Sequence, residues 1–169
     1  MDPSMLRVGA GYDAHRLETG RKLILGGEEI GFDRGFAGHS DADVLVHAII
    51  DSLLGAASLG DIGKLFPDTD ARYKGVSSIA LLDKVGALLI ANGYRIINID
   101  SVVVLERPKI GGHVERMKAN IARALGIEPE VIGIKGKTTE GLGFEGTGEG
   151  GSSYAVCLLY KNEEEKING

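Results

Sequence analysis

Apolar residues recur along much of the chain at helical spacing. Residues 41–54 and residues 77–92 carry them at three- and four-residue steps, which predicts two amphipathic helices. Ser40 is expected to cap the first helix, with acidic residues in its positive first turn, and Gly93 stands where a glycine ends the second. A third helix is expected at residues 113–125.

Shorter runs rich in apolar and β-branched residues predict the strands. We expect them at residues 6–12, 23–25, 96–105, 131–135 and 154–160. The resulting order is strand, short strand, helix, helix, strand, helix, strand, strand. We therefore expect an α+β fold, a two-layer sandwich in which helices pack on one face of a mixed four-stranded sheet.

Length and composition indicate one globular domain. The 169 residues are 43% hydrophobic and 25% charged, close to the average for globular proteins. Glycine occurs 26 times, about twice its usual share of roughly 7%, and is expected in turns and at close backbone approaches. We take residues 1–169 as a single domain with a frayed polar tail at 161–169. A second methionine at Met5 is compatible with residues 1–4 being either native or added ahead of the natural start.

Charge and cysteine content exclude several classes of protein. The net charge of -5, from 19 basic and 24 acidic residues, argues against nucleic-acid binding. No apolar run approaches the roughly 20 residues of a membrane span, and the N-terminus lacks the apolar core of a secretory signal. Cys157 is the single cysteine, which excludes an internal disulfide and fits a reducing compartment. We expect a cytoplasmic protein, with Cys157 as a packing residue.

Three residues have the chemistry of a zinc site. Asp13 and His15 directly follow the opening strand, and residues two apart in extended chain project to the same side. His47 falls inside the first predicted helix. An Asp-x-His pair is equally typical of a strand-end turn, and a lone histidine on an apolar helix is more often a core residue. If the three face one another, they form a three-ligand site with an open position, the pattern of catalytic zinc.

Two loops also carry candidate ligand groups. In residues 60–70, glycines flank Asp61 and a proline leads into Asp-Thr-Asp, which is typical of a surface loop or of carboxylates offered to a polyol. In residues 106–112, Lys109 and two glycines directly follow a strand, where ligands commonly bind α/β sheets. A strand-to-helix turn with solvated charges explains the second loop equally well.

The densest signal lies at residues 135–151. Eight of the 26 glycines fall between Gly133 and Gly151, beside two lysines and two threonines. These groups favour a phosphate cradle, and Glu140 could share a divalent cation with phosphate oxygens. The segment is neither a Walker A loop nor a Rossmann turn, and a flexible glycine loop is the alternative.

Four motifs in order carry a family resemblance. The chain reads GYDAHR at 11–16, HSDADVLVHA at 39–48, LGDIGKLFPDTD at 59–70 and KTTEGLGF at 137–144. This closely resembles the 2-C-methyl-D-erythritol 2,4-cyclodiphosphate synthases from about Leu6 to Tyr160. The resemblance implies a cyclising phosphorus–oxygen lyase of non-mevalonate isoprenoid biosynthesis. It would convert 4-diphosphocytidyl-2-C-methyl-D-erythritol 2-phosphate to the cyclic 2,4-diphosphate and CMP, as a homotrimer with active sites between subunits.

The resemblance also implies roles for individual residues. Asp13, His15 and His47 would bind one Zn²⁺ per subunit, and Glu140 would hold Mg²⁺ or Mn²⁺ on the substrate diphosphate. His39 and Thr138 would be catalytic, positioning the reacting phosphates. The substrate contacts would be Asp13, His15, His39, Ser40, Asp61, Ile62, Gly63, Phe66, Pro67, Asp68, Thr69, Asp70, Leu105, Lys109, Gly111, Lys137, Thr138, Thr139, Glu140 and Phe144.

Two positions depart from the family pattern. Thr147 stands where many relatives have a basic residue, so the isoprenoid diphosphate that can bind on the family's threefold axis loses a cation here. Lys137 replaces a common threonine and makes the cradle more cationic. Two other classes compete with the cyclase: a zinc phosphohydrolase, which would release linear phosphates, and a nucleotide-binding or structural trimer without turnover.

Overall fold

The computed structural model of the protein describes residues 2–67, 69–73 and 75–162. Its strands are β1 (Leu6–Thr19), β2 (Leu23–Leu25), β3 (Glu28–Ile30), β4 (Arg34–Phe36), β5 (Tyr94–Val104), β6 (Ile132–Lys137) and β7 (Gly150–Lys161). Its helices are α1 (Val44–Ala56), α2 (Ile62–Leu65), α3 (Ser78–Ala91), α4 (Val114–Leu125) and α5 (Gly143–Gly146). Short 3₁₀ turns lie at Pro3–Met5, Ala71–Tyr73, Gly111–His113 and Pro129–Val131.

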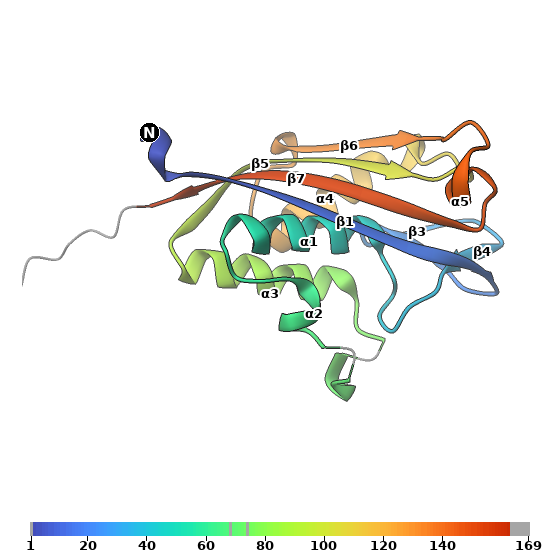
Figure 1. Ribbon diagram of the computed structural model, residues 1–169, viewed down its shortest axis with the longest axis horizontal. Coiled ribbons are helices and arrows are strands. Elements are labelled where there is room, and N and C mark those ends of the chain that lie inside the picture. Colours follow the sequence, from blue (N-terminus) through green and yellow to red (C-terminus); the bar gives the residue numbers. More distant parts are fainter. Residues whose placement is uncertain (1, 68, 74, 163–169) are drawn as a thin grey trace, which may run out of the picture.

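The main sheet has the order β4-β1-β7-β5-β6, with a separate β2–β3 hairpin. Only β5 and β6 run parallel, while the other neighbours in this sheet are antiparallel. Helices α1, α3 and α4 lie on one side of the sheet (Figure 1). The predicted α+β sandwich with a mixed sheet is therefore confirmed.

The prediction of four strands is wrong, because β4 adds a fifth. It has three residues with Gly35 at its centre, so no local alternation marks it as a strand. It forms because the far end of β1, from Leu17 to Thr19, offers a free edge with which Arg34–Phe36 pairs. The same pairing, together with β7, extends β1 well beyond the predicted end at Tyr12.

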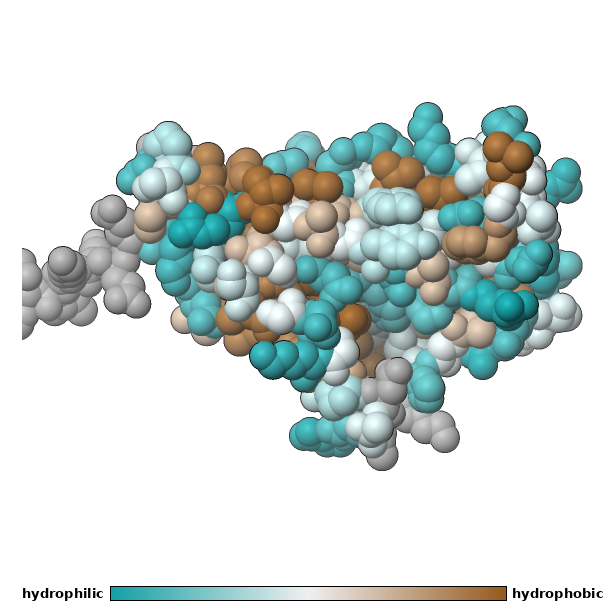
Figure 2. All heavy atoms as spheres, viewed as in Figure 1, coloured by the Kyte–Doolittle hydropathy of each residue, from teal (hydrophilic) through white to brown (hydrophobic). Residues whose placement is uncertain are grey.

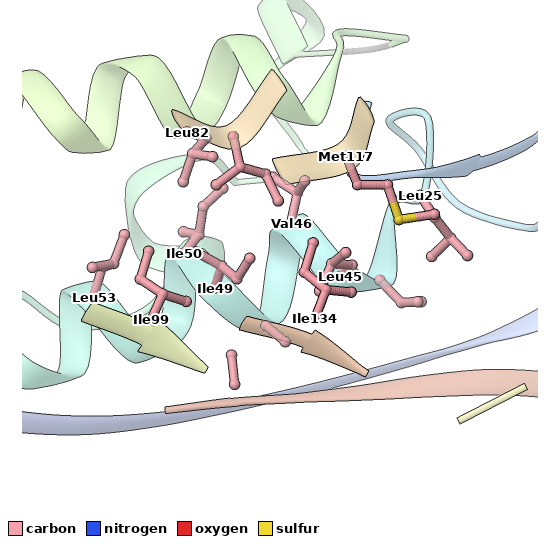
Figure 3. Close-up of a cluster of buried hydrophobic side chains, with 14 of the residues drawn as sticks. Leu25, Leu45, Val46, Ile49, Ile50, Leu53, Leu82, Ile99, Met117 and Ile134 are labelled. Atoms are coloured by element: carbon pink, nitrogen blue, oxygen red, sulfur yellow. The ribbon is translucent and has the colours of Figure 1, made fainter. Parts of the chain in front are cut away.

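Helix α1 forms the centre of the core. It lies between the sheet and α3, with Leu45, Ile49 and Leu53 fully buried among side chains from both layers (Figure 3). Burying one such side chain contributes about 1.5–3 kcal/mol. The apolar residues that predicted a helix here are thus buried on nearly every side of α1, and not only on one face.

Two glycines let α1 approach the sheet unusually closely. A Cβ atom at Gly9 would lie 1.9 Å from the carbonyl oxygen of Ser52, and one at Gly11 would lie 2.0 Å from that of Ala48. Neither distance is sterically possible, so β1 needs glycine at both positions. The close approach brings the first turns of α1 beside the second half of β1.

Among the described residues, α1, α3 and α4 leave the opposite face of the sheet uncovered (Figure 1). Val8 and Tyr12 of β1 are 70% and 47% exposed, and Tyr154 and Val156 of β7 are 52% and 48% exposed. Hydrophobic side chains are visible along the sheet side of the molecule in Figure 2. Within the described residues, no helix combines the length and the apolar character that crossing a membrane requires.

Candidate active site

Strand β1 and helix α1 bring Asp13, His15 and His47 together. Oδ2 of Asp13 lies 3.1 Å from Nε2 of His15 and 2.9 Å from Nδ1 of His47. Asp13 and His15 project to the same side because they are two apart in a strand. The close contact of α1 with β1 supplies the third group. The structure thus brings the three predicted zinc ligands to one point.

The orientation of the two histidines fits a metal ion. Nδ1 of His15 donates to the carbonyl oxygen of Ala37 at 2.6 Å, so Nε2, which lies on the side of Asp13, is the ring nitrogen left to bind an ion. The ligand atoms of the three residues all lie within 4.8 Å of one another. Two ligands of a tetrahedral zinc ion are separated by about 3.3 Å, close to the 3.1 Å and 2.9 Å that separate Asp13 from the two histidines. An Asp/His/His donor set of this kind suits Zn²⁺.

Asp13 is held as a carboxylate. Burial by itself would raise the pKa of Asp13, but its close contacts with His15 and His47 outweigh burial and hold the pKa well below its ordinary value. Its side chain is 24% exposed, so one side of the group stays open to a ligand. Asp13 therefore offers a negatively charged oxygen without needing to lose a proton first.

A cavity of about 240 Å³, here called the metal cavity, opens beside these three residues. It is lined by Asp13, His15, Gly38, His39, Ser40, His47, Ile62, Gly63, Phe66, Tyr73 and Leu81. The predicted substrate residues His39, Ser40, Ile62, Gly63 and Phe66 are thus in its wall. The lining combines ligand nitrogens and a carboxylate with the apolar side chains of Ile62, Phe66 and Leu81.

A second cavity of about 530 Å³, here called the lysine cavity, lies at the carboxyl ends of the parallel strands β5 and β6. Its lining is Val103, Leu105, Pro108, Lys109, Ile110, Gly111, Gly136, Lys137, Thr138 and Glu140. The predicted residues Leu105, Lys109, Gly111, Lys137, Thr138 and Glu140 gather here. The two motifs meet because parallel neighbours end at the same sheet edge.

Thr138 and Glu140 contact each other at the rim of the lysine cavity. The Thr138 hydroxyl donates to Oε1 of Glu140 at 2.5 Å. Glu140 adopts a φ of 54°, a left-handed conformation that costs a non-glycine residue energy. The Glu140 side chain is exposed, so its second carboxylate oxygen can reach a ligand.

Other predicted site residues line neither cavity. Asp61 caps α2 by accepting the N–H of Lys64 at 2.8 Å, and Asp70 pairs with Arg72 at 2.6 Å. Pro67 and Thr69 are exposed, and Asp68 lies outside the described residues. The Thr139 hydroxyl donates to the carbonyl oxygen of Leu142. Phe144 borders a separate depression that it shares with His15 and Glu149.

The motif between β4 and α1 divides its two carboxylates between two helices. Asp43, not Ser40, caps α1 by accepting the N–H of Val46 at 3.1 Å. Ala42 has a left-handed φ of 55°, which turns the chain between the two aspartates. Asp41 accordingly faces α3 and accepts the N–H of Ser78 at 3.0 Å. The expectation that both serve the first turn of one helix is wrong for Asp41.

Sequence reasoning missed several residues around the metal cavity. Tyr73 and Leu81 line it, and the Ser78 hydroxyl contacts Nε2 of His47, the ring nitrogen that does not face Asp13. Ser78 was expected only near the start of a helix, and its second role depends on α3 packing beside α1. Within the sequence, the only signal was a pair of serines at a helix start.

One family model covers nearly the whole chain. The model of the YgbB family matches residues 6–160. A 2-C-methyl-D-erythritol 2,4-cyclodiphosphate synthase of Clostridium perfringens is 58% identical over 156 residues, covering 92% of this chain and 100% of that protein.

Solved structures show the same fold. A Plasmodium falciparum IspF in complex with CDP has a TM-score of 0.82 and 34% identity, over 95% of this chain and 100% of that one. The bifunctional IspDF of Campylobacter jejuni has a TM-score of 0.89 and 39% identity, covering 94% of this chain. The present chain spans 43% of that longer protein.

Proposed function

The chain belongs to the YgbB family, and we propose that it converts 4-diphosphocytidyl-2-C-methyl-D-erythritol 2-phosphate to 2-C-methyl-D-erythritol 2,4-cyclodiphosphate and CMP. It is a cyclising lyase of non-mevalonate isoprenoid biosynthesis. The observation that carries the proposal is the convergence of Asp13, His15 and His47 on one cavity in a chain so similar to these synthases.

The reaction is an internal phosphoryl transfer. An oxygen of the 2-phosphate attacks the β-phosphorus, the bond from that phosphorus to the α-phosphate oxygen breaks, and CMP leaves with the electron pair. No enzyme nucleophile is needed, so the protein has to hold two mutually repelling anions in line. His39 of the metal cavity and Thr138 of the lysine cavity would position the phosphates as donors.

The metal ligands proposed for this reaction are the three residues that converge in the metal cavity. Asp13, His15 and His47 would hold Zn²⁺, and Glu140 would hold Mg²⁺ or Mn²⁺ at the diphosphate. Bound at these places, the ions supply Lewis-acid polarisation and neutralise negative charge on the phosphates. The grouping of the donors supports the first assignment, because one ligand atom from each of the three residues lies within 4.8 Å of the other two.

The cavities divide the substrate between them. We assign the methylerythritol part to the metal cavity, whose wall combines Ser40 with apolar Ile62 and Phe66. The cytidine diphosphate is assigned to the lysine cavity, where Lys109 and Lys137 supply positive charge beside glycines. The net charge of -5 by itself would disfavour an anionic substrate, and these cations provide local positive charge where the substrate would bind.

A homotrimer would bring the two kinds of cavity together. The two cavities of one chain share no lining residue. The face of the sheet without helices exposes apolar side chains of β1 and β7, including Val8 and Val156. Packing such faces around a threefold axis would bury them and place the lysine cavity of one copy near the metal cavity of its neighbour.

Product analysis tests the function directly. The protein is incubated with the cytidine substrate and Mg²⁺, with and without a zinc chelator, and followed by phosphorus NMR. We expect CMP and the cyclic diphosphate in equal amounts, and loss of both on chelation. Linear phosphates would identify a zinc phosphohydrolase instead, and absence of turnover at full zinc content would contradict both enzymes.

A further inference from the structure

A chain of hydrogen bonds reaches His47 from the side opposite Asp13. Nε2 of His47 lies 2.8 Å from the Ser78 hydroxyl oxygen. That hydroxyl donates to Oδ1 of Asp41 in a very short hydrogen bond, and Oδ2 of Asp41 accepts the backbone N–H of Ser78 at 3.0 Å. Ser78 is fully buried, so its hydroxyl has no access to solvent. The chain joins the start of α3 to a proposed metal ligand on α1.

The donors and acceptors in this chain are compatible with one arrangement of hydrogens. A serine hydroxyl has a single hydrogen, and Ser78 gives it to Asp41. The Ser78 oxygen then has only lone pairs to turn toward Nε2 of His47, which lies 2.8 Å away. A lone pair on Nε2 would be repelled by them. Nε2 therefore carries a hydrogen and donates it to Ser78.

A hydrogen on Nε2 determines what Nδ1, the other ring nitrogen of His47, can bind. Nδ1 of His47 lies 2.9 Å from Oδ2 of Asp13. When a metal ion takes the place of any hydrogen between these two atoms, the ring keeps its one hydrogen on Nε2 and Nδ1 offers its lone pair to the ion. The Ser40 hydroxyl oxygen lies farther from Nε2, at 3.2 Å, and it also accepts the backbone N–H of Ala42 at 3.1 Å. Asp41 and Ser78 thus decide which nitrogen faces the site.

We propose that Asp41 and Ser78 are positioning residues for the metal site: Asp41 orients the Ser78 hydroxyl, which holds His47 in the Nε2–H form and aims Nδ1 at the ion. Neither residue touches substrate in this assignment. The inference rests on the zinc site of the proposed function but not on turnover. Outer groups that orient a metal-bound histidine commonly change metal affinity by about 10- to 100-fold.

The test measures zinc affinity by competition with a chromophoric chelator, in the full chain. Ser78→Ala removes the acceptor, and Asp41→Asn keeps the size of the side chain but frees the Ser78 hydroxyl to point elsewhere. We expect both to weaken zinc binding by about 10- to 100-fold. The matched control is Ser77→Ala, because Ser77 precedes α3 without a side-chain capping bond, and its affinity should stay within about twofold.

A spectroscopic readout separates positioning from general loosening of the fold. In zinc-loaded, nitrogen-15-labelled protein, long-range proton–nitrogen spectra should show His47 with hydrogen on Nε2 and zinc on Nδ1. Asp41→Asn should lose this single pattern while its melting temperature without zinc stays near that of the parent. If Ser78→Ala does not fold, the zinc affinity and the His47 spectrum of Asp41→Asn test the proposal without it. Parent-like zinc affinity and an unchanged His47 spectrum in Asp41→Asn, or equal loss in Ser77→Ala, would overturn the proposal.

Discussion

The metal cavity and the lysine cavity present their polar groups in opposite ways. Around the metal cavity, His15 and His47 have both ring nitrogens engaged, and the side chain of His47 is 12% exposed. Around the lysine cavity, Lys109, Lys137 and Glu140 are exposed at its rim. The first arrangement suits a small ion that needs fixed geometry, and the second suits a larger anion that brings its own shape.

The difference follows from the elements that carry each cavity. The metal ligands stand on β1 and α1, whose backbones are in direct contact at Gly9 and Gly11. The lysine cavity is built largely from the segments that follow β5 and β6. Sites on packed helices and strands hold their geometry more tightly than sites on loops. We therefore expect substitutions at the first cavity to act on metal content and at the second on substrate affinity.

The largest effect is expected from His47→Ala. Removing one of three proposed ligands should release most of the zinc and lower the rate of CMP release about a thousandfold, since a Lewis-acid metal contributes several kcal/mol. Metal analysis and a CMP assay measure the two effects. His113→Ala is the control, because His113 pairs with Glu28 and lines neither cavity. Full zinc content and turnover in His47→Ala would remove it from the ligand set.

The next effect tests the contact that positions the metal ligands. Gly11→Ala would place a Cβ 2.0 Å from the carbonyl oxygen of Ala48, so α1 has to move away from β1. We expect a loss of about 3 kcal/mol in the free energy of unfolding, measured by urea denaturation. Gly55→Ala on α1 meets nothing within 4 Å and should be neutral or stabilising. Equal behaviour of the two variants would show that the close approach is not needed.

A smaller effect concerns the buried charge that caps α1. Burial raises the pKa of Asp43 to about 6, helped by the nearby Asp41 and opposed by hydrogen bonds from Gly27 and Val46. The folded protein therefore binds a proton at Asp43 that the unfolded chain has already lost, so Asp43 lowers stability as the pH rises from about 4 to 6.

Comparison with Asp43→Asn isolates this titration. The stability of the parent relative to Asp43→Asn should fall by about 2 kcal/mol between pH 4.5 and pH 7, in urea denaturation of zinc-free protein. A difference that rises with pH would mean that the fold prefers the ionised carboxylate at Asp43, contrary to the raised pKa.

The smallest effect is expected at the lysine cavity. Lys109→Ala should raise KM for the cytidine substrate about tenfold, the value of one charge-assisted contact to phosphate, and leave the zinc content unchanged. Steady-state kinetics and metal analysis check this split. Lys118→Ala on α4 removes an equal charge outside both cavities and should leave KM as it is. An unchanged KM in Lys109→Ala would take Lys109 out of the pocket and break the contrast between the cavities.

Local pattern was sufficient for the long elements and for the individual ligands. The sequence predicted α1, α3 and α4 to within a few residues. For α1 and α3 the signal was the periodic apolar residues, because burial of apolar side chains is what stabilises such helices. The two-residue spacing of Asp13 and His15 likewise determined that both project to one side of a strand. Strand β4 escaped prediction, because its three residues form a strand only through pairing with β1.

By itself, the sequence determined which residue types could bind a metal or a phosphate and roughly on which elements they lie. Tertiary structure alone decided that His47 meets Asp13, which is 34 residues away, and that Ser78 and Asp41 meet behind it. It also decided that Lys109 and Lys137 share a cavity that is separate from the metal ligands. The physical reason is that periodicity records only which face of an element is buried, whereas these contacts depend on how closely α1, α3 and the sheet pack against one another.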